Sequence, residues 1–452
     1  MKRLFLALLA VLFLTFAFAD TKLELGFNGN IVANHWNPIK LTTRDEKSAK
    51  LVLNIDQGNL RDGSNIVSYS FAIPQSYGIS IFENDIYIPK WQKFTWQLIN
   101  DSEVLASGSF DRRFASPSKL SLIISANPSK WFRLSDERAA NVAANSLTKR
   151  LASYDGISKI IIDGTAPAPS LENLIAAATA GANVALIEPL PASHQDILAL
   201  APDQLQSLGA GFITRSKSVI ETPQVDFDKV FGNFVSNNSI TPPKSKPQIP
   251  IVAALSIFAV IVVVLMRLGQ KAAILTTLSL SLIASILAWS YLMPKTFEIK
   301  KSQSIQIASG ELAKEYKITS IFSLRGDQVS IDGSGYLLEH IPFNQVDETS
   351  QINIARWKDI KYSYKPTLSK ALLVLGDNKI YNRSKFTLTD VYIKGLGFLA
   401  DLPPGGSTIQ SQEDHKLPKL YEGIIGPLAN GTAIARYANN VLIALAPQEV
   451  SP

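Results

Sequence analysis

The sequence contains no cysteine. The chain therefore has no disulfide bond, no thiolate ligand for a metal and no cysteine nucleophile. Histidine is scarce as well, and the four copies are His35, His194, His340 and His415. No two of them have the H-x-x-x-H spacing of a zinc site, so we expect neither a metal nor another cofactor.

Two further signatures are missing. The nucleophile elbow of serine hydrolases, G-x-S-x-G, does not occur. Positive charge is not concentrated either, because the formal charge of +6 is spread over 452 residues without a long Lys/Arg run. Proteins that bind nucleic acid present a clustered basic surface, so we expect no nucleic-acid partner.

Long apolar runs are present. Residues 249–266 and 272–293 carry no charge, and only five residues separate them. A bilayer core about 30 Å thick is crossed by roughly 20 apolar residues in a helix. The two runs therefore predict a transmembrane helical hairpin over 249–293, with the lipid bilayer as a partner and both flanking segments on one side of the membrane.

The first nineteen residues have the composition of a signal peptide. Lys2 and Arg3 precede an apolar core, and Ala17-Phe18-Ala19 resembles a cleavage site before Asp20. An uncleaved anchor is the alternative. Both versions predict a protein of the bacterial cytoplasmic (inner) membrane whose domains lie on the extracytoplasmic side, although Lys295, Lys300 and Lys301 outside the membrane disagree with the positive-inside rule.

Small polar residues recur along the second run at four-residue spacing, at Thr277, Ser281 and Ser285. A face of small residues lets two helices approach closely. We expect it to pack against the first run, and a homodimer interface is the alternative.

The segments 20–116 and 294–452 have the pattern of β-sheet domains. Short runs rich in β-branched and aromatic residues alternate with turn signals such as Asn28-Gly29 and Asp62-Gly63. The first segment predicts a β-sandwich, in which Trp36, Trp91 and Trp96 pack into the core. The second predicts a further β-rich domain.

Residues 117–236 alternate between strand and helix patterns. Apolar runs at 120–125, 160–162 and 184–187 suit buried parallel strands. Ser135, Ser170 and Ser193 are each predicted to cap the helix pattern that follows, and the first of these helices extends to about residue 151. The segment predicts an open α/β domain, and the Pro-rich stretch 237–248 predicts a linker.

Several motifs resemble a set of bacterial membrane proteins of unknown role: LGF at 25–27, WNPI at 36–39, IIID at 160–163, AGANVALI at 180–187, LGAGFI at 208–213 and LADLPPG at 399–405. Those proteins combine an exported β-domain with an α/β domain similar to class I glutamine amidotransferases. The resemblance implies a flavodoxin- or amidotransferase-like fold for 117–236. Because this chain has no cysteine, it implies no amidotransferase activity.

The candidate site lies where the strands of the α/β segment end. Asn127, Asp163 and Glu188 follow three of these strands, and each stands directly before Pro or Gly. Ligands of open α/β sheets bind beyond the carboxyl ends of the strands, so these residues are candidates for contact with a small polar ligand or a partner loop. Ordinary turn residues are the competing interpretation. His194, at a helix start, is expected to be exposed rather than catalytic.

These patterns together predict a multidomain fold, α/β plus all-β, with a transmembrane hairpin. They favour a non-enzymatic, membrane-anchored envelope protein that binds a ligand or a protein partner, or that serves as a subunit of a membrane complex. The alternative is an exported hydrolase or transferase that uses the α/β domain without a cysteine.

Overall fold

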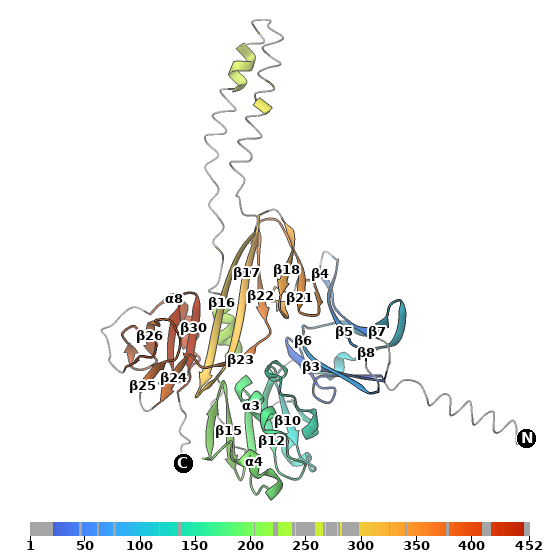
Figure 1. The fold of residues 1–452 in the computed structure, drawn as a ribbon, viewed down its shortest axis with the longest axis vertical. Coiled ribbons are helices and arrows are strands. Elements are labelled where there is room, and N and C mark those ends of the chain that lie inside the picture. Colours follow the sequence, from blue (N-terminus) through green and yellow to red (C-terminus); the bar gives the residue numbers. More distant parts are fainter. Residues whose placement is uncertain are drawn as a thin grey trace, which may run out of the picture.

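The computed structural model is dominated by β-sheet (Figure 1). It describes residues 21–44, 48–60, 63–75, 78–116, 118–133, 138–202, 204–219, 225–236, 240, 258–264, 267, 278, 281–282, 298–324, 326–339, 341–376, 379–408 and 417–446. Strands make up 52% of these residues and helices 17%. The signal peptide predicted for residues 1–19, like His340 and His415, lies outside the described residues.

The predicted transmembrane hairpin is not supported. Among the described residues, no helix has both the length and the apolar character needed to cross a bilayer. On this finding the hairpin, the fold class that contained it and the assignment to the inner membrane are not supported by the described residues. Within 249–293 only 258–264, 267, 278 and 281–282 are described; Thr277 and Ser285 of the predicted dimer face lie outside.

The α/β segment forms a six-stranded sheet whose order is β11-β10-β12-β13-β15-β14. The strands are β10 (Leu120–Ile124), β11 (Arg138–Asn141), β12 (Ile157–Ile162), β13 (Asn183–Ile187), β14 (Leu205–Leu208) and β15 (Gly211–Ser216). All pair in parallel except the edge strand β14. If the five parallel strands are numbered by their order in the chain, their order across the sheet is 2-1-3-4-5, which is the flavodoxin-like arrangement.

Alternate residues of β10 and β12 enter cores on opposite faces of this sheet. Leu122 and Ile160 join the core beneath α3 (Leu171–Ala180). Ile123 and Ile161 join a smaller core with Trp131 of α2 (Ser129–Phe132). Burial on both faces explains why these strands read as continuous apolar runs in the sequence.

The helix predicted from Ser135 to residue 151 is wrong. Residues 134–137 are not described, and the stretch beyond them contains β11 and the short 3-10 helices η2 (Ala144–Ser146) and η3 (Leu151–Tyr154). Alanines here favour a helix, but β11 pairs with β10, and Ala140 and Val142 are buried in the core. Tertiary pairing outweighs helix propensity.

The two β-rich segments do not form separate units, because β5 pairs in parallel with β20. The resulting seven-stranded sheet has the order β18-β21-β20-β5-β4-β7-β8. It consists of β4 (Ala49–Leu60), β5 (Gly63–Ile73), β7 (Lys93–Asn100), β8 (Glu103–Phe110), β18 (Asp327–Asp332), β20 (Phe343–Val346) and β21 (Thr349–Ile354). The fold is thus a β-rich assembly built from both ends of the chain.

A three-stranded sheet of β1 (Lys22–Leu25), β3 (His35–Thr43) and β6 (Ser80–Ile88) shares a core with this sheet. Leu53 and Tyr69 from the first half of the chain lie in one cluster with Ile352 and Tyr362 from the second half. Trp36, Trp91 and Trp96 are buried, which confirms their predicted packing role.

A nine-stranded sheet contains most of the other strands of the C-terminal segment (Figure 1). Its strands are β16 (Glu298–Ser309), β17 (Leu312–Ser323), β19 (Gly335–Leu337), β22 (Lys358–Tyr364), β23 (Thr367–Lys370), β26 (Thr389–Ile393), β27 (Gly397–Phe398), β29 (Ala433–Tyr437) and β30 (Asn440–Ala444). Against it pack α5 (Phe227–Ser236) and α8 (Lys419–Ile425), through Val230, Phe234 and Tyr421.

The remaining elements are short. They are the pair β2 (Ile31–Val32) and β9 (Ala115–Ser116), the sheet of β24 (Leu373–Gly376), β25 (Lys379–Asn382) and β28 (Ser407–Thr408), the helix α4 (Gln195–Leu198), and the 3-10 helices η1 (Arg112–Phe114) and η4 (Ala192–His194).

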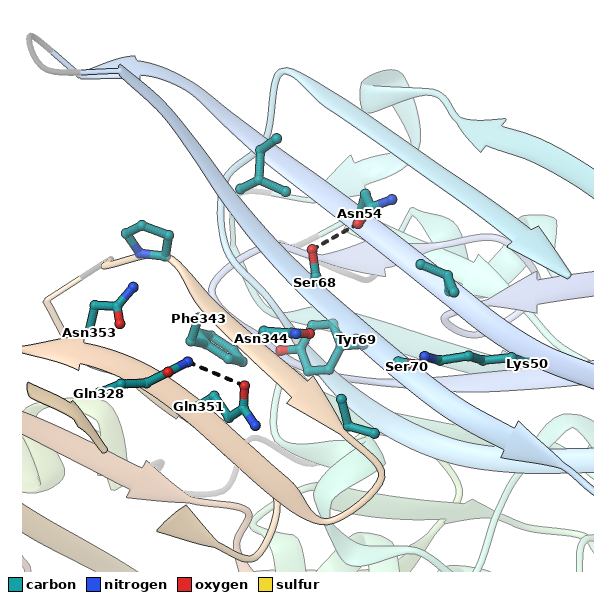
Figure 2. Close-up of a pocket in the computed structure, with 14 residues that line it drawn as sticks. Lys50, Asn54, Ser68, Tyr69, Ser70, Gln328, Phe343, Asn344, Gln351 and Asn353 are labelled. Carbon is teal, nitrogen blue, oxygen red and sulfur yellow. Dashed lines mark hydrogen bonds between the residues drawn. The ribbon is translucent and has the colours of Figure 1, made fainter. Parts of the chain in front are cut away.

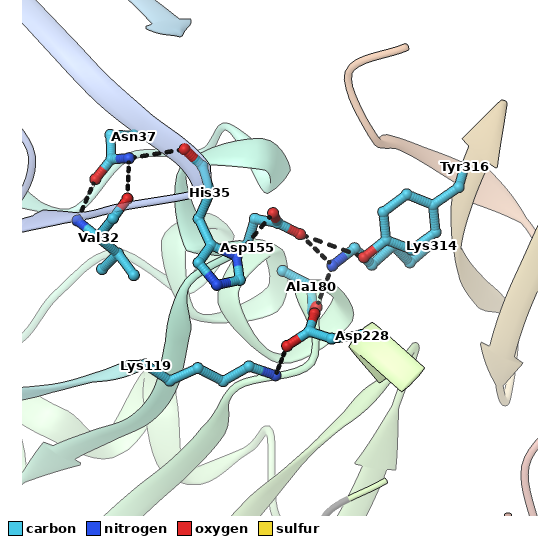
Figure 3. A network of polar contacts seen from close by, with 9 residues as sticks. All are labelled: Val32, His35, Asn37, Lys119, Asp155, Ala180, Asp228, Lys314 and Tyr316. Atoms are coloured by element: carbon cyan, nitrogen blue, oxygen red, sulfur yellow. Dashed lines mark hydrogen bonds and ion pairs between the residues drawn. The ribbon is translucent and has the colours of Figure 1, made fainter. Parts of the chain in front are cut away.

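A polar cluster around Asp155 joins the α/β segment to the two β-rich segments (Figure 3). The Asp155 carboxylate lies 3.2 Å from His35 Nδ1 on β3 and 3.1 Å from Lys314 Nζ on β17. The Tyr316 hydroxyl donates to the same carboxylate at 3.2 Å, and Lys314 also donates to the Ala180 carbonyl at 2.9 Å. We call these residues the Asp155 clamp; they hold the α/β sheet against both β-rich segments.

Candidate functional site

A hollow of about 900 Å³ lies at the carboxyl ends of β10, β11 and β12. In a sheet of order 2-1-3-4-5 the switch point falls between the first and third strands, here β10 and β12, and ligands bind there. The walls are the loops that follow these three strands, joined by Asn28 and by Asn173 of α3. We call it the switch-point hollow.

No side chain that lines the hollow, among the described residues, carries a charge. The apolar part comes from alanines, prolines, Val142 and Leu147, and the polar part from amides and hydroxyls. Volumes of about 300–1,000 Å³ and an apolar lining with a few placed polar groups are typical of small-molecule sites.

Asp163, one of the predicted site residues, connects the loops that follow β10 and β12. Its carboxylate accepts hydrogen bonds from the hydroxyls of Ser125 and Thr165, both at 2.6 Å. The Trp131 indole donates at 2.7 Å and the Thr165 amide at 3.0 Å. Four donors from three segments therefore converge on one carboxylate.

These hydrogen bonds set the protonation state of Asp163. Partial burial by itself raises the pKa of the carboxyl, but the bonds from Ser125, Thr165 and Trp131 outweigh it and bring the pKa below its ordinary value. A carboxylate that accepts several hydrogen bonds is stabilised in its ionised form. Asp163 is thus a fixed acceptor at neutral pH.

The two hydroxyls also accept hydrogen bonds. Ser125 Oγ accepts from the Asn127 amide, and Thr165 Oγ1 accepts from the Ala126 amide, both at 2.9 Å. Each hydroxyl therefore gives its proton to Asp163 while its oxygen takes a backbone N–H. The cluster fixes the geometry of the hollow's rim.

The other two predicted residues have different roles. Asn127 contributes its backbone amide to the cluster. Glu188 pairs with Arg215 Nε on β15 at 2.5 Å, and both side chains are about one-third exposed. Of the three predicted residues, the structure therefore places Asp163 and the Asn127 backbone at the switch point, whereas Glu188 forms its ion pair with β15.

Sequence reasoning missed Ser125, Asn141 and Thr165, which line the hollow. The amide of Asn141, oriented to suit its neighbours, donates to the carbonyls of Ile123 at 2.9 Å and Ser125 at 3.2 Å. The position of Thr165 two residues after Asp163 was an available signal, since an Asx turn pairs such residues.

The histidines offer no catalytic geometry among the described residues. His194 is buried, which corrects the expectation of an exposed side chain; its Nδ1 lies 3.1 Å from Ser193 Oγ. His35 belongs to the Asp155 clamp. The described residues contain no group of three His, Asp or Glu side chains that could hold a metal ion.

No protein-family model matches this chain, and no curated protein matches it either. The resemblance to amidotransferase-like membrane proteins stays a prediction.

Proposed function

We propose that this protein is a non-enzymatic binding protein and that the switch-point hollow takes a small uncharged molecule. The observation that carries the proposal is the uncharged hollow at the topological switch point of the α/β sheet. An apolar body would fit against the alanines, prolines and Val142, and a few hydroxyl or carbonyl groups would bond with Asn28 and Asn145.

The bonding of Asp163 favours binding over catalysis. A general base works best when its pKa lies near the working pH, and the pKa of Asp163 is lowered instead. The Ser125 and Thr165 hydroxyls already donate to this carboxylate. Among the described residues, neither hydroxyl forms a hydrogen bond with an imidazole that would activate it as a nucleophile.

The proposal is tested by filling the hollow. Ala143 is exposed and lines it, so Ala143→Trp should occupy the space that a ligand needs. We expect ligand-observed NMR to show neutral fragment molecules binding to the parent chain. They should bind the variant at least tenfold more weakly.

Ala192→Trp is the matched control, because Ala192 is an exposed alanine of the same α/β segment outside the hollow. It should leave binding unchanged. Fragments that bind all three proteins equally would refute the proposal, and so would a parent chain that binds none of them.

A further inference from the structure

A second hollow, of about 500 Å³, lies on the seven-stranded sheet where the two halves of the chain meet (Figure 2). Its sides are β4 and β5 from the first half and β20, β21 and β18 from the second. It shares no lining residue with the switch-point hollow. We call it the amide hollow, after the five Asn and Gln side chains that line it.

Four of the polar side chains form a row across four strands. Asn54 on β4 is the register partner of Ser68 on β5. Ser68 in turn is opposite Asn344 on β20, and Asn344 is opposite Gln351 on β21. Neighbouring strands lie about 4.8 Å apart, so the row extends over roughly 14 Å.

Part of the hydrogen-bonding capacity of the amide hollow is unused. The Ser68 hydroxyl donates to Asn54 Oδ1 at 2.8 Å, and Gln328 Nε2 donates to Gln351 Oε1 at 3.4 Å. Asn344 and Asn353 are exposed, and their amides form no side-chain hydrogen bond with another described residue. Each amide offers both donors and an acceptor.

The lining contains no carboxylate among the described residues, and its one charged group is the Lys50 ammonium. Beside the polar row lie the apolar side chains of Val52, Ile66 and Val346. Neutral amides with small apolar surfaces between them match a ligand that alternates hydroxyl groups with C–H surface.

An extended peptide fits less well. Peptides that add to a sheet use the free main-chain groups of an edge strand. Here β5 pairs with β4 on one side and with β20 on the other, and β20 pairs with β21. At the centre of the hollow the main chain is thus already paired, and side chains carry the recognition.

We propose that the amide hollow binds a neutral oligosaccharide, laid along the row from Asn54 to Gln351. Asn344 and Asn353 supply the hydrogen bonds to its hydroxyl groups. This site goes beyond the function proposed above and is independent of it.

The test is a calorimetric titration of the full chain with two probes, the β-1,4-linked hexamers of glucose and of N-acetylglucosamine. We expect at least one hexamer to bind. Asn344→Ala combined with Asn353→Ala should weaken that binding at least tenfold while the melting temperature stays close to that of the parent, since both side chains are exposed.

Gln97→Ala is the matched control. Gln97 is an exposed amide on the same face of the same sheet, opposite Val52, and does not line the hollow. It should bind the hexamer as the parent does. Binding of neither hexamer, equal binding by the double variant, or binding of an alanine hexapeptide in their place would each overturn the proposal.

Discussion

Individual carboxylates of this protein differ in what surrounds them, and Asp163 and Glu188 form a matched pair. Both directly follow a parallel strand, yet Asp163 accepts four hydrogen bonds, whereas Glu188 accepts one from Arg215 and is about one-third exposed. Asp163→Ala leaves Ser125, Thr165 and Trp131 without their acceptor, which costs about 1–3 kcal/mol in the free energy of unfolding. Glu188→Ala removes a partly exposed ion pair that contributes about 1 kcal/mol or less.

Urea unfolding of both variants measures the difference. Equal losses of stability would show that the Asp163 bonds contribute no more than a surface pair. The sequence places both residues correctly at strand ends. It cannot show that the Asp163 carboxylate accepts four hydrogen bonds, because the donors come from positions 125, 131 and 165.

Among the elements, α3 borders the switch-point hollow with its first turn. Ser170 is its N-cap and accepts from the Asn173 amide at 3.4 Å, as the sequence predicts. Ser193, predicted as another cap, does not act as one: α4 begins after His194, and no side chain caps it. The prediction of an N-cap is therefore confirmed for Ser170 and wrong for Ser193.

We expect Ser170→Ala to lower the free energy of unfolding by about 1 kcal/mol, the usual contribution of an N-cap serine. Ser193→Ala should change it by a smaller amount, because Ser193 lies within the 3-10 helix η4 and, among the described residues, its hydroxyl forms a hydrogen bond only with the neighbouring His194 ring. Thermal unfolding followed by circular dichroism compares the two. A larger loss for Ser193→Ala would contradict this assignment.

Local patterns predict the strands well. The apolar runs at 51–55, 67–73, 316–323 and 440–444 all lie inside strands of the structure. What they cannot predict is pairing, because β5 and β20 are 270 residues apart and no local signal links them. For this reason the sequence predicts two separate β-rich domains, and that prediction is wrong.

Over the whole molecule, the Asp155 clamp links segments that the sequence keeps far apart. Lys314 is 3% exposed and Asp155 13%, so the pair is largely shielded from water. Burial alone would raise the pKa of the Asp155 carboxyl, but the Lys314 ammonium and His35 together lower it well below its ordinary value. Burial and the Asp155 carboxylate raise the pKa of Tyr316, which therefore stays a neutral donor.

Asp155→Asn should reduce the free energy of unfolding by about 3–5 kcal/mol at pH 7, because it leaves the Lys314 ammonium buried without its counter-charge. Asp111→Asn is the control. Asp111 pairs with Arg113 at the surface, where ion pairs contribute little, so the unfolding midpoint should stay that of the parent.

The pH dependence of the clamp follows from the direction of the Asp155 shift. A carboxyl whose pKa is lower in the folded state stabilises the fold above its unfolded pKa of about 3.9, and this contribution is lost as the pH falls toward the folded value. A protonated Asp155 resembles asparagine, so the gap between the parent and Asp155→Asn should narrow steadily below pH 4. Urea titrations between pH 7 and pH 2 measure that gap. A gap that stays constant over this range would mean that the Asp155 charge does not hold the two halves of the chain together, and the shared cores alone would then account for their association.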